Sequence, residues 1–439
     1  MHSAVENMKY GMVKISRTVF LSFAIAFSMV AVTLSAKVLK DHVDSGGIPC
    51  WDLRLRYDEI QCVQGGLNPY EIFVGKVTSP KYRGHPRPDV PFDTDESKKL
   101  VCTYPAWHTS WCYFYGWLPW PFMRLACIII NTIFLFAVWC YVLSRFSKRT
   151  VLEKAFVSFA FFGFFANPIT VGYLSGNYGF LLMALALAMF WLLERDYDIL
   201  AGLCWGVMMF KPQVGLLFGW PILLKGKTKT IATAATFCII GLLIGSLLIG
   251  KDPIGLLMEI PDSVPPDPAG ELIPGTFTWF CQSLLGVSAK TIKLVLCFSL
   301  CGVLSFVLRR SKSWIVSALP VIYMIPLWTY SKPYDLVIQW PWLLIVFAYI
   351  MQDFDGMNSV KPAIKESLRI LASVMLLASI IVNIDKLLAA ANMEIWAMGT
   401  LHTIYMKHIG ATCSIVSKAL FILFCFYAWK RKDGAVYSF

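Results

Sequence analysis

The sequence has little charge and few residues suited to holding a metal. Only 15% of its 439 residues are charged, whereas soluble globular domains carry about 25%. Its six histidines are scattered, and it has no His-Glu-x-x-His motif and no Cys-x-x-Cys pair, so we expect no metal centre. It also lacks the Gly-x-x-x-x-Gly-Lys-Ser/Thr and Gly-x-Gly-x-x-Gly motifs that bind nucleotide phosphates. We therefore expect an activity without a nucleotide or other cofactor.

Hydrophobic residues, in contrast, make up 57% of the chain, and its mean hydropathy is +0.62. A helix needs about 20 apolar residues to cross the hydrocarbon core of a bilayer. Long uncharged runs predict an all-α, polytopic membrane protein with one domain over residues 1–439. The first run could be a signal peptide, but no clear small-residue cleavage pattern follows it, which favours a retained helix. The candidate runs are Thr18–Ala36, Pro119–Leu143, Ala155–Gly172, Tyr178–Leu193, Ile199–Leu223, Ile231–Ile249, Ile292–Val307, Trp314–Tyr330, Asp335–Ile350, Leu368–Ile384 and Ala411–Ala428.

The positions of the basic residues indicate a membrane topology rather than nucleic-acid binding. The net charge is +12, but lysine and arginine gather at the ends of the apolar runs, as the positive-inside rule requires. This pattern predicts both termini in the cytoplasm and two long outer connections, residues 37–118 and 250–291. We expect membrane lipids and no nucleic acid as partners, and a bacterial-type plasma membrane as the location.

One run breaks this alternation, because residues 199–223 have basic inner signals at both ends, at Arg195 and at residues 225–229. Pro212 follows Lys211 in the middle of the run, and proline interrupts a helix. Two half-helices would enter and leave on the same side, as broken helices in membranes do. The sequence thus predicts about ten crossings and one re-entrant pair.

The first outer connection contains the leading catalytic candidate, Asp52. A carboxylate at the membrane surface can take a proton from a hydroxyl nucleophile. The alternative is a structural ion pair with Arg54 or Arg56. Asp58 is a weaker candidate for the base, and we interpret it as a solvated or supporting carboxylate. Many Trp and Tyr residues follow, which suits short interfacial helices and stacking on sugars, or a plain aromatic belt.

Two lysines mark further polar positions. Lys211 stands at the predicted helix break, and a lysine at membrane depth marks a functional site by default. It could bind a phosphate, extend its amine to the interface or form an ion pair. Lys332 lies in a tight outer turn, followed by Tyr334 and Asp335.

Most of the 13 cysteines, including Cys127 and Cys140, lie within apolar runs and are interpreted as small buried side chains. The first outer connection contains four others. An oxidising compartment would permit one or two disulfides among them, with the pairing open. These four are Cys50, Cys62, Cys102 and Cys112.

Three blocks of residues make the chain resemble C-type membrane glycosyltransferases of family 87, the polyprenyl-phosphate-mannose type. The blocks are Asp52-Leu53-Arg54 with Gly66–Tyr70 and Tyr104-Pro105; Gly176-Asn177 with Glu194-Arg195, Ala201-Gly202 and Lys211-Pro212; and Lys332–Leu336 with Pro341. The sequence departs from the family pattern at Arg56, where an aromatic residue is common, and at Ala106 and Asn177, in place of proline and glutamine.

The resemblance implies an inverting transfer of mannose or another hexose from a polyprenyl-phosphate donor. The acceptor would be a hydroxyl of a glycolipid or glycan, and the reaction would take place outside the membrane without a metal. Asp52 would be the general base. The donor phosphate would be bound by Arg54, Arg56, Lys211 and Lys332. The implied substrate-binding residues are Tyr57, Asp58, Tyr70, Tyr104, His108, Asn177, Tyr334 and Asp335.

Two other classes were considered. A polysaccharide polymerase or ligase also acts on lipid-linked glycans, but residues 250–291 contain none of the arginine or histidine residues expected in its late loop. A transporter would also use broken helices, but it would show repeated halves and more ionisable residues within its spans.

Overall fold

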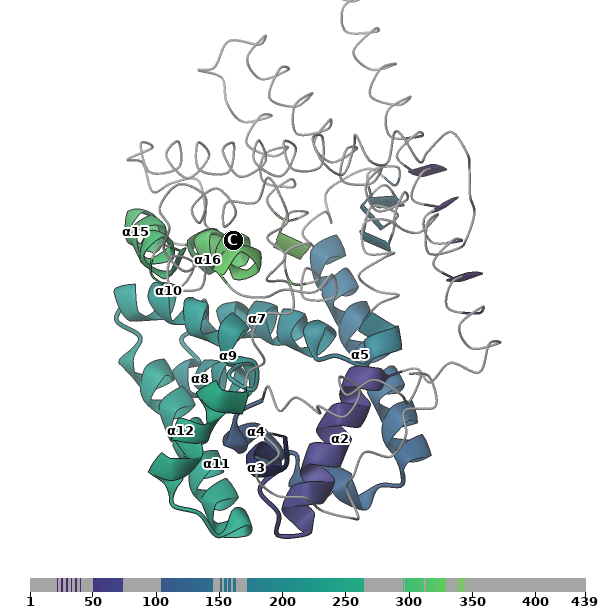
Figure 1. Cartoon of the computed structure of the whole chain (residues 1–439). Helices are drawn as coiled ribbons and strands as arrows, with labels where there is room; N and C mark the ends of the chain where they lie inside the picture. Colours follow the sequence, from purple (N-terminus) through teal and green to yellow (C-terminus); the bar gives the residue numbers. More distant parts are fainter. Residues whose placement is uncertain are drawn as a thin grey trace, which may run out of the picture. The chain divides into compact units, whose positions relative to one another are not determined.

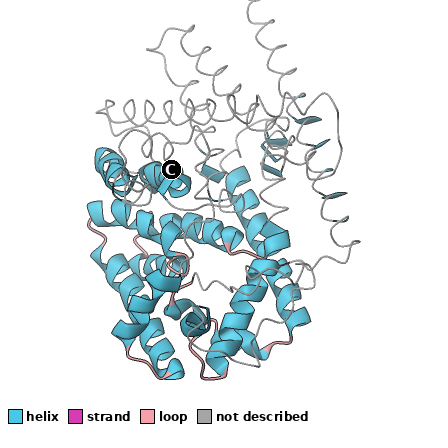
Figure 2. Ribbon diagram, viewed as in Figure 1, coloured by secondary structure: helices cyan, strands magenta, loops and turns pink. Residues whose placement is uncertain are grey.

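The computed structural model describes residues 50–73, 104–144, 172–263, 297–311 and 313–328, with scattered positions within 22–40, 151–162 and 295–345. Within these ranges the regular structure is entirely helical and contains no strand (Figures 1 and 2). The chain forms two compact units. The larger comprises residues 45–134, 172–338 and 418–439, and the smaller comprises residues 1–44, 135–171 and 339–417.

The larger unit contains the helices that carry the candidate site. They are α2 (Trp51–Gln64), α3 (Pro69–Phe73), α4 (Ala106–Trp111), η2 (Tyr113–Trp117), the first part of α5 (Trp120–Ser144), α7 (Gly179–Leu193), α8 (Asp198–Met208), α9 (Pro212–Gly215), η3 (Leu216–Phe218), α10 (Gly219–Leu224), α11 (Thr228–Ile249), α12 (Pro253–Ser263), α15 (Phe298–Leu308) and α16 (Trp314–Trp328). The predicted first outer connection therefore contains short helices. In the smaller unit, Trp139 packs against Phe136 and Phe162.

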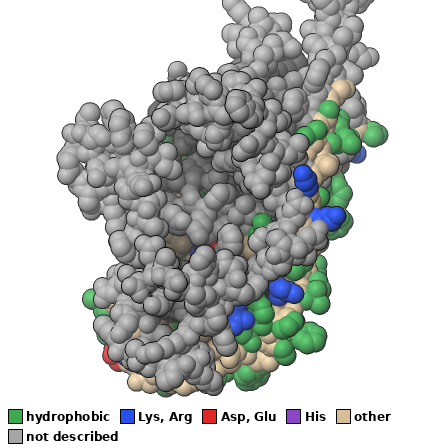
Figure 3. Space-filling model, turned by 45° about the vertical axis from the view of Figure 1, so that its right-hand side comes forward, with side chains coloured by type: hydrophobic (Ala, Val, Ile, Leu, Met, Phe, Trp, Pro, Cys, Tyr) green, Lys and Arg blue, Asp and Glu red, His purple; other side chains and the backbone are tan. Residues whose placement is uncertain are grey.

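Two of these helices, α5 and α11, are long and apolar enough to cross a membrane. Their bounds agree with the predicted runs 119–143 and 231–249 to within three residues. Large apolar side chains on α5 are exposed, including Phe122, Ile133 and Phe136. Figure 3 shows hydrophobic side chains over much of the described part of one face, with lysine and arginine among them. Such exposure is costly in water and favourable in lipid.

The predicted helix break is confirmed. Helix α8 ends at Met208, and α9 begins at Pro212, the position where proline fits because the first helical N–H needs no partner. The indole of Trp205 donates to the carbonyl of Gly215 at 2.8 Å across the break. With 11 residues, α8 is about 16 Å long, roughly half the ~30 Å hydrocarbon core.

The two ends of the broken segment lie together. Lys227, just before α11, forms ion pairs with Asp196 at 2.6 Å and Asp198 at 3.0 Å, just before and at the start of α8. Helices α8 and α11 lie side by side and run parallel, since Gly202 approaches Thr233 and Gly206 approaches Phe237 (Figure 1). The chain thus returns to its starting end, as the charge pattern predicted.

The predicted runs 178–193, 292–307 and 314–330 correspond to α7, α15 and α16. Of the other five, the runs at 368–384 and 411–428 lie outside the described residues. The runs at 18–36, 155–172 and 335–350 are described only at scattered positions, so the number of crossings stays a prediction.

Candidate active site

Asp52 lies in the first turn of α2, and the start of this helix rests on the turn before α7. The amide of Cys50 donates to the carbonyl of Leu174. Gly176 in that turn has a φ of +65°, and a Cβ there would lie 2.7 Å from Cβ of Cys50. Only glycine combines this backbone conformation with such a close approach, which explains the Gly176-Asn177 pair of the second sequence block.

Asn177 donates a hydrogen bond from Nδ2 to Oδ2 of Asp52 at 3.1 Å. The two residues are 125 positions apart in the chain; Asp52 is half-buried, and Asn177 is 5% exposed. Within the described residues, neither Arg54 nor Arg56 forms an ion pair with Asp52, because each pairs with another carboxylate. The structural ion pair considered as an alternative for Asp52 is therefore not formed.

Arg54 lies on a partly exposed side of α2. It pairs with Asp58 at 3.0 Å, one turn later, and its guanidinium lies 5.0 Å from the ring centre of Trp120 and 5.7 Å from that of Tyr57. The hydroxyl of Tyr57 donates to the carbonyl of Leu118 at 2.8 Å. This side of α2 therefore offers a cation and aromatic surface near the membrane-length helix α5.

Arg56, in contrast, is buried. Its side chain is 6% exposed and pairs at 2.5 Å with Glu59, which is fully buried. The guanidinium also lies 4.3 Å from the ring centre of Tyr104, a favourable cation–π geometry. These contacts give Arg56 a structural role in joining α2 to the segment before α4.

An aromatic cluster connects α2, α4 and the broken helix. The ring of His108 lies 4.8 Å from that of Tyr104 and 5.2 Å from that of Phe210, at the helix break. Ile60 of α2 and Tyr178, next to Asn177, pack in the same cluster. Lys211 follows Phe210 and is 5% exposed at the start of α9. The predicted site segments around residues 52, 104, 177 and 211 therefore meet in one unit.

His108 and Tyr178 form a buried polar pair. Nε2 of His108 lies 2.9 Å from the hydroxyl of Tyr178. Burial, together with the charge of Arg56, lowers the pKa of His108 well below its usual value. The imidazole is therefore neutral, and its tautomer decides which of the two groups donates the hydrogen bond.

The depressed pKa of His108 predicts a loss of stability in mild acid. Below pH ~6.5 a histidine in the unfolded chain binds a proton that the folded protein excludes, so the free energy of unfolding falls by up to about 1.4 kcal/mol per pH unit. Thermal unfolding at pH 5.0 and 7.5 should show this fall for wild type and a smaller one for His108→Gln. Equal falls in both proteins would contradict the assignment.

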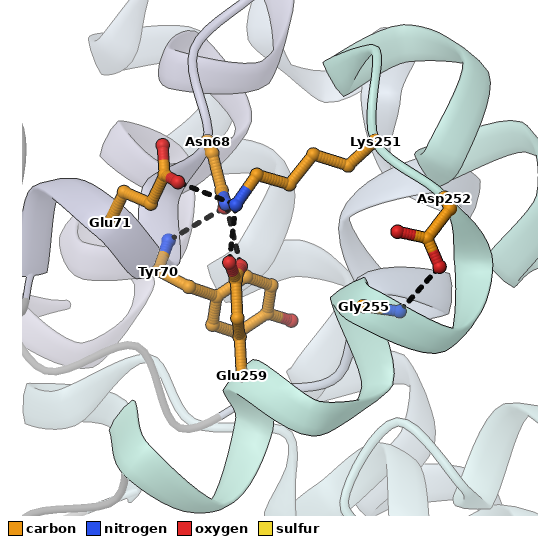
Figure 4. A network of polar contacts seen from close by, with 7 residues as sticks. All are labelled: Asn68, Tyr70, Glu71, Lys251, Asp252, Gly255 and Glu259. Atoms are coloured by element: carbon orange, nitrogen blue, oxygen red, sulfur yellow. Dashed lines mark hydrogen bonds and ion pairs between the residues drawn. The ribbon is translucent and has the colours of Figure 1, made fainter.

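A second polar network joins the two outer connections (Figure 4). Lys251 contacts both Glu71 and Glu259, and Asn68 donates to Glu259 at 2.6 Å. The bonds to Glu259 and Glu71 raise the pKa of Lys251. Tyr70, in the same segment, donates from its hydroxyl to the carbonyl of Tyr104 at 2.7 Å. The conspicuous Gly66–Tyr70 motif thus anchors this part of the first connection.

Some predicted residues are not covered. Lys332, Tyr334, Asp335 and Cys102 lie outside the described residues. Cys50, Cys62 and Cys112 are present as free, buried thiols, so no disulfide joins any two of these three in the structure.

The helices of membrane length and the family comparison together define a membrane glycosyltransferase. The model of glycosyltransferase family 87 matches residues 103–338, more than half of the chain, and the chain belongs to this family. The match covers Asn177 and Lys211, whereas Asp52 precedes it. Comparison with curated proteins and with solved structures gave no match.

Proposed function

We propose that this protein transfers mannose or another hexose from a polyprenyl-phosphate donor to a hydroxyl of a glycolipid or glycan at the outer face of the plasma membrane. Asp52 acts as the general base. The observation that carries this proposal is the hydrogen bond from Asn177 to Asp52. It joins the residue chosen as base to a turn inside the family match, and it occupies only one carboxylate oxygen.

In this mechanism Asp52 takes the proton of the acceptor hydroxyl. The acceptor oxygen attacks the anomeric carbon, the bond from this carbon to the phosphate oxygen breaks, and polyprenyl phosphate leaves with the negative charge. Positive groups stabilise that charge. Arg54, Lys211 and Lys332 are the candidates, because Arg56 is already buried against Glu59. Tyr57 and Tyr334 are candidates for packing on the sugar ring.

Asn177 should act on the reaction through Asp52. Its N–H group holds the carboxylate in place, so we expect Asn177→Ala to lower kcat roughly tenfold. Asn177→Gln should restore part of the rate, since it keeps the amide donor. A wild-type rate for Asn177→Ala, or an equal loss in Asn177→Ala and Asn177→Gln, would contradict this role.

The proposed donor class is tested with membranes from cells with and without the protein. Radiolabelled polyprenyl-phosphate mannose should label endogenous lipid or glycan acceptors only when the protein is present. Radiolabelled nucleotide-activated mannose should not label these acceptors when its conversion to the lipid-linked form is blocked. Direct use of the nucleotide sugar would overturn the proposed donor. Labelling from another polyprenyl-phosphate hexose would retain the donor class and change the sugar.

A further inference from the structure

Two thiols pack near the start of α2, the helix that carries Asp52. Cys50 precedes α2, is 1% exposed and stands two residues before Asp52. Cys127 lies on α5, about two turns from its start. Both pack in one cluster with Leu53 and Met123. Cys50 belongs to the first outer connection and Cys127 to the predicted run 119–143. Nothing in the sequence indicated that these two cysteines pack in one cluster.

The same short turn binds both sulfur atoms. The thiol of Cys50 donates to the carbonyl of Tyr173 at 3.6 Å, and the thiol of Cys127 donates to the carbonyl of Gly176 at 3.8 Å. The amide of Asn131 also contacts the sulfur of Cys127 at 3.5 Å. The two thiols therefore reach the same short segment, residues 173–176, from two different elements.

The backbone at Cys50 is unusual. Its φ is +75°, in the left-handed region where glycine or asparagine costs least. A cysteine there accepts strain of about 1–3 kcal/mol. A function for the thiol itself explains why this residue type occupies a position better suited to glycine.

We propose that Cys50 and Cys127 are a disulfide site, where a covalent bond ties the start of α2 to α5 and so holds Asp52 in place. The proposal rests on the proposed function, which places this end of α2 outside the membrane in a compartment that oxidises thiols. In the structure both groups are in their reduced form.

The reaction is a thiol–disulfide exchange with a disulfide oxidant. The Cys50 thiolate attacks one oxidant sulfur, breaks the oxidant S–S bond and displaces one thiolate. The Cys127 thiolate then attacks Sγ of Cys50, which forms the Cys50–Cys127 bond and releases the second thiolate. Two electrons and two protons leave with the oxidant as a dithiol. Because both thiols are shielded once packed, the exchange takes place while α2 docks on α5.

The other two described thiols of the first outer connection, Cys62 and Cys112, are also buried. Burial raises the pKa of Cys62 and of Cys112 to about 12. Cys112 packs with Ile60, Tyr104 and Phe210 rather than with another cysteine, so this thiol provides an internal control that should stay reduced.

Peptide mapping of the full-length protein tests the proposal. Membranes are treated with N-ethylmaleimide, then the protein is denatured under further alkylation and digested with trypsin without reduction. We expect residues 41–54 linked to residues 125–145. The second peptide holds both Cys127 and Cys140, so the Cys140→Ser variant assigns the partner. Recovery of Cys50 and Cys127 as alkylated thiols, or a link from Cys50 to another cysteine, overturns the proposal.

A stability measurement provides a second test. Reductant should lower the Tm of wild type and of Cys140→Ser by several degrees, and should leave the Cys50→Ser/Cys127→Ser double variant unchanged. Equal responses of all three proteins would contradict the disulfide. Neither experiment needs sugar transfer. An absent bond with Asp52-dependent transfer intact therefore removes this inference alone, and a mapped bond without transfer removes only the proposed function.

Discussion

Replacing Asp52 by asparagine lowers the rate of sugar transfer by roughly 10²–10⁴-fold, the usual contribution of a positioned general base. The substitution keeps the size of the side chain and removes its ability to accept a proton. Since Asn177 holds one carboxylate oxygen at 3.1 Å, the variant side chain should keep its position and its packing. The loss should therefore appear in kcat, with little change in the Tm.

The matched control is Asp198→Asn, the same chemical change at the start of α8. Asp198 pairs with Lys227, a partly exposed ion pair worth at most about 1 kcal/mol, so transfer should stay within ~2-fold of wild type. Initial rates would be measured with radiolabelled polyprenyl-phosphate mannose at equal protein levels. Transfer by Asp52→Asn at the control rate would contradict the role of Asp52 and shift attention to Asp58 or Asp335.

The local features of the fold were predictable because they depend on neighbouring residues. Apolar runs between charged ends predicted α5, α7 and α11 almost to their bounds, since helix length and hydropathy set which segments can cross a bilayer. The break at Pro212 followed from the missing N–H and fixed φ of proline. The return of the broken segment followed from the basic residues at both of its ends.

The contacts within the candidate site were less predictable because they join segments distant in sequence. Nothing near Lys251 indicates that it contacts Glu71, 180 positions away. The resemblance suggested Asp52 and Asn177 as separate site residues, and only the fold brings the amide to the carboxylate. Arg54 and Arg56 look alike in sequence, but the 3.6-residue helical period turns one toward the surface and the other into the interior.

That difference between two arginines of one helix predicts a large difference in stability. Arg56→Met leaves the fully buried carboxylate of Glu59 without the guanidinium that lies 2.5 Å away. Removing one partner of a buried ion pair costs about 3–5 kcal/mol. Arg54→Met breaks a pair whose side chains are 30% and 23% exposed, and such pairs contribute at most about 1 kcal/mol. Thermal unfolding in detergent or nanodiscs should therefore show a much lower Tm for Arg56→Met.

The double variant Arg56→Met/Glu59→Met separates the loss of the Arg56–Glu59 ion pair from the loss of the cation–π contact with Tyr104. Two apolar side chains leave no buried charge, so we expect the double variant to regain most of the lost Tm. The contact with Tyr104, at 4.3 Å, would account for the part that is not regained. Equal Tm losses for Arg54→Met and Arg56→Met would instead mean that Arg56 is solvated, and would return it to the group of cations available for the donor phosphate.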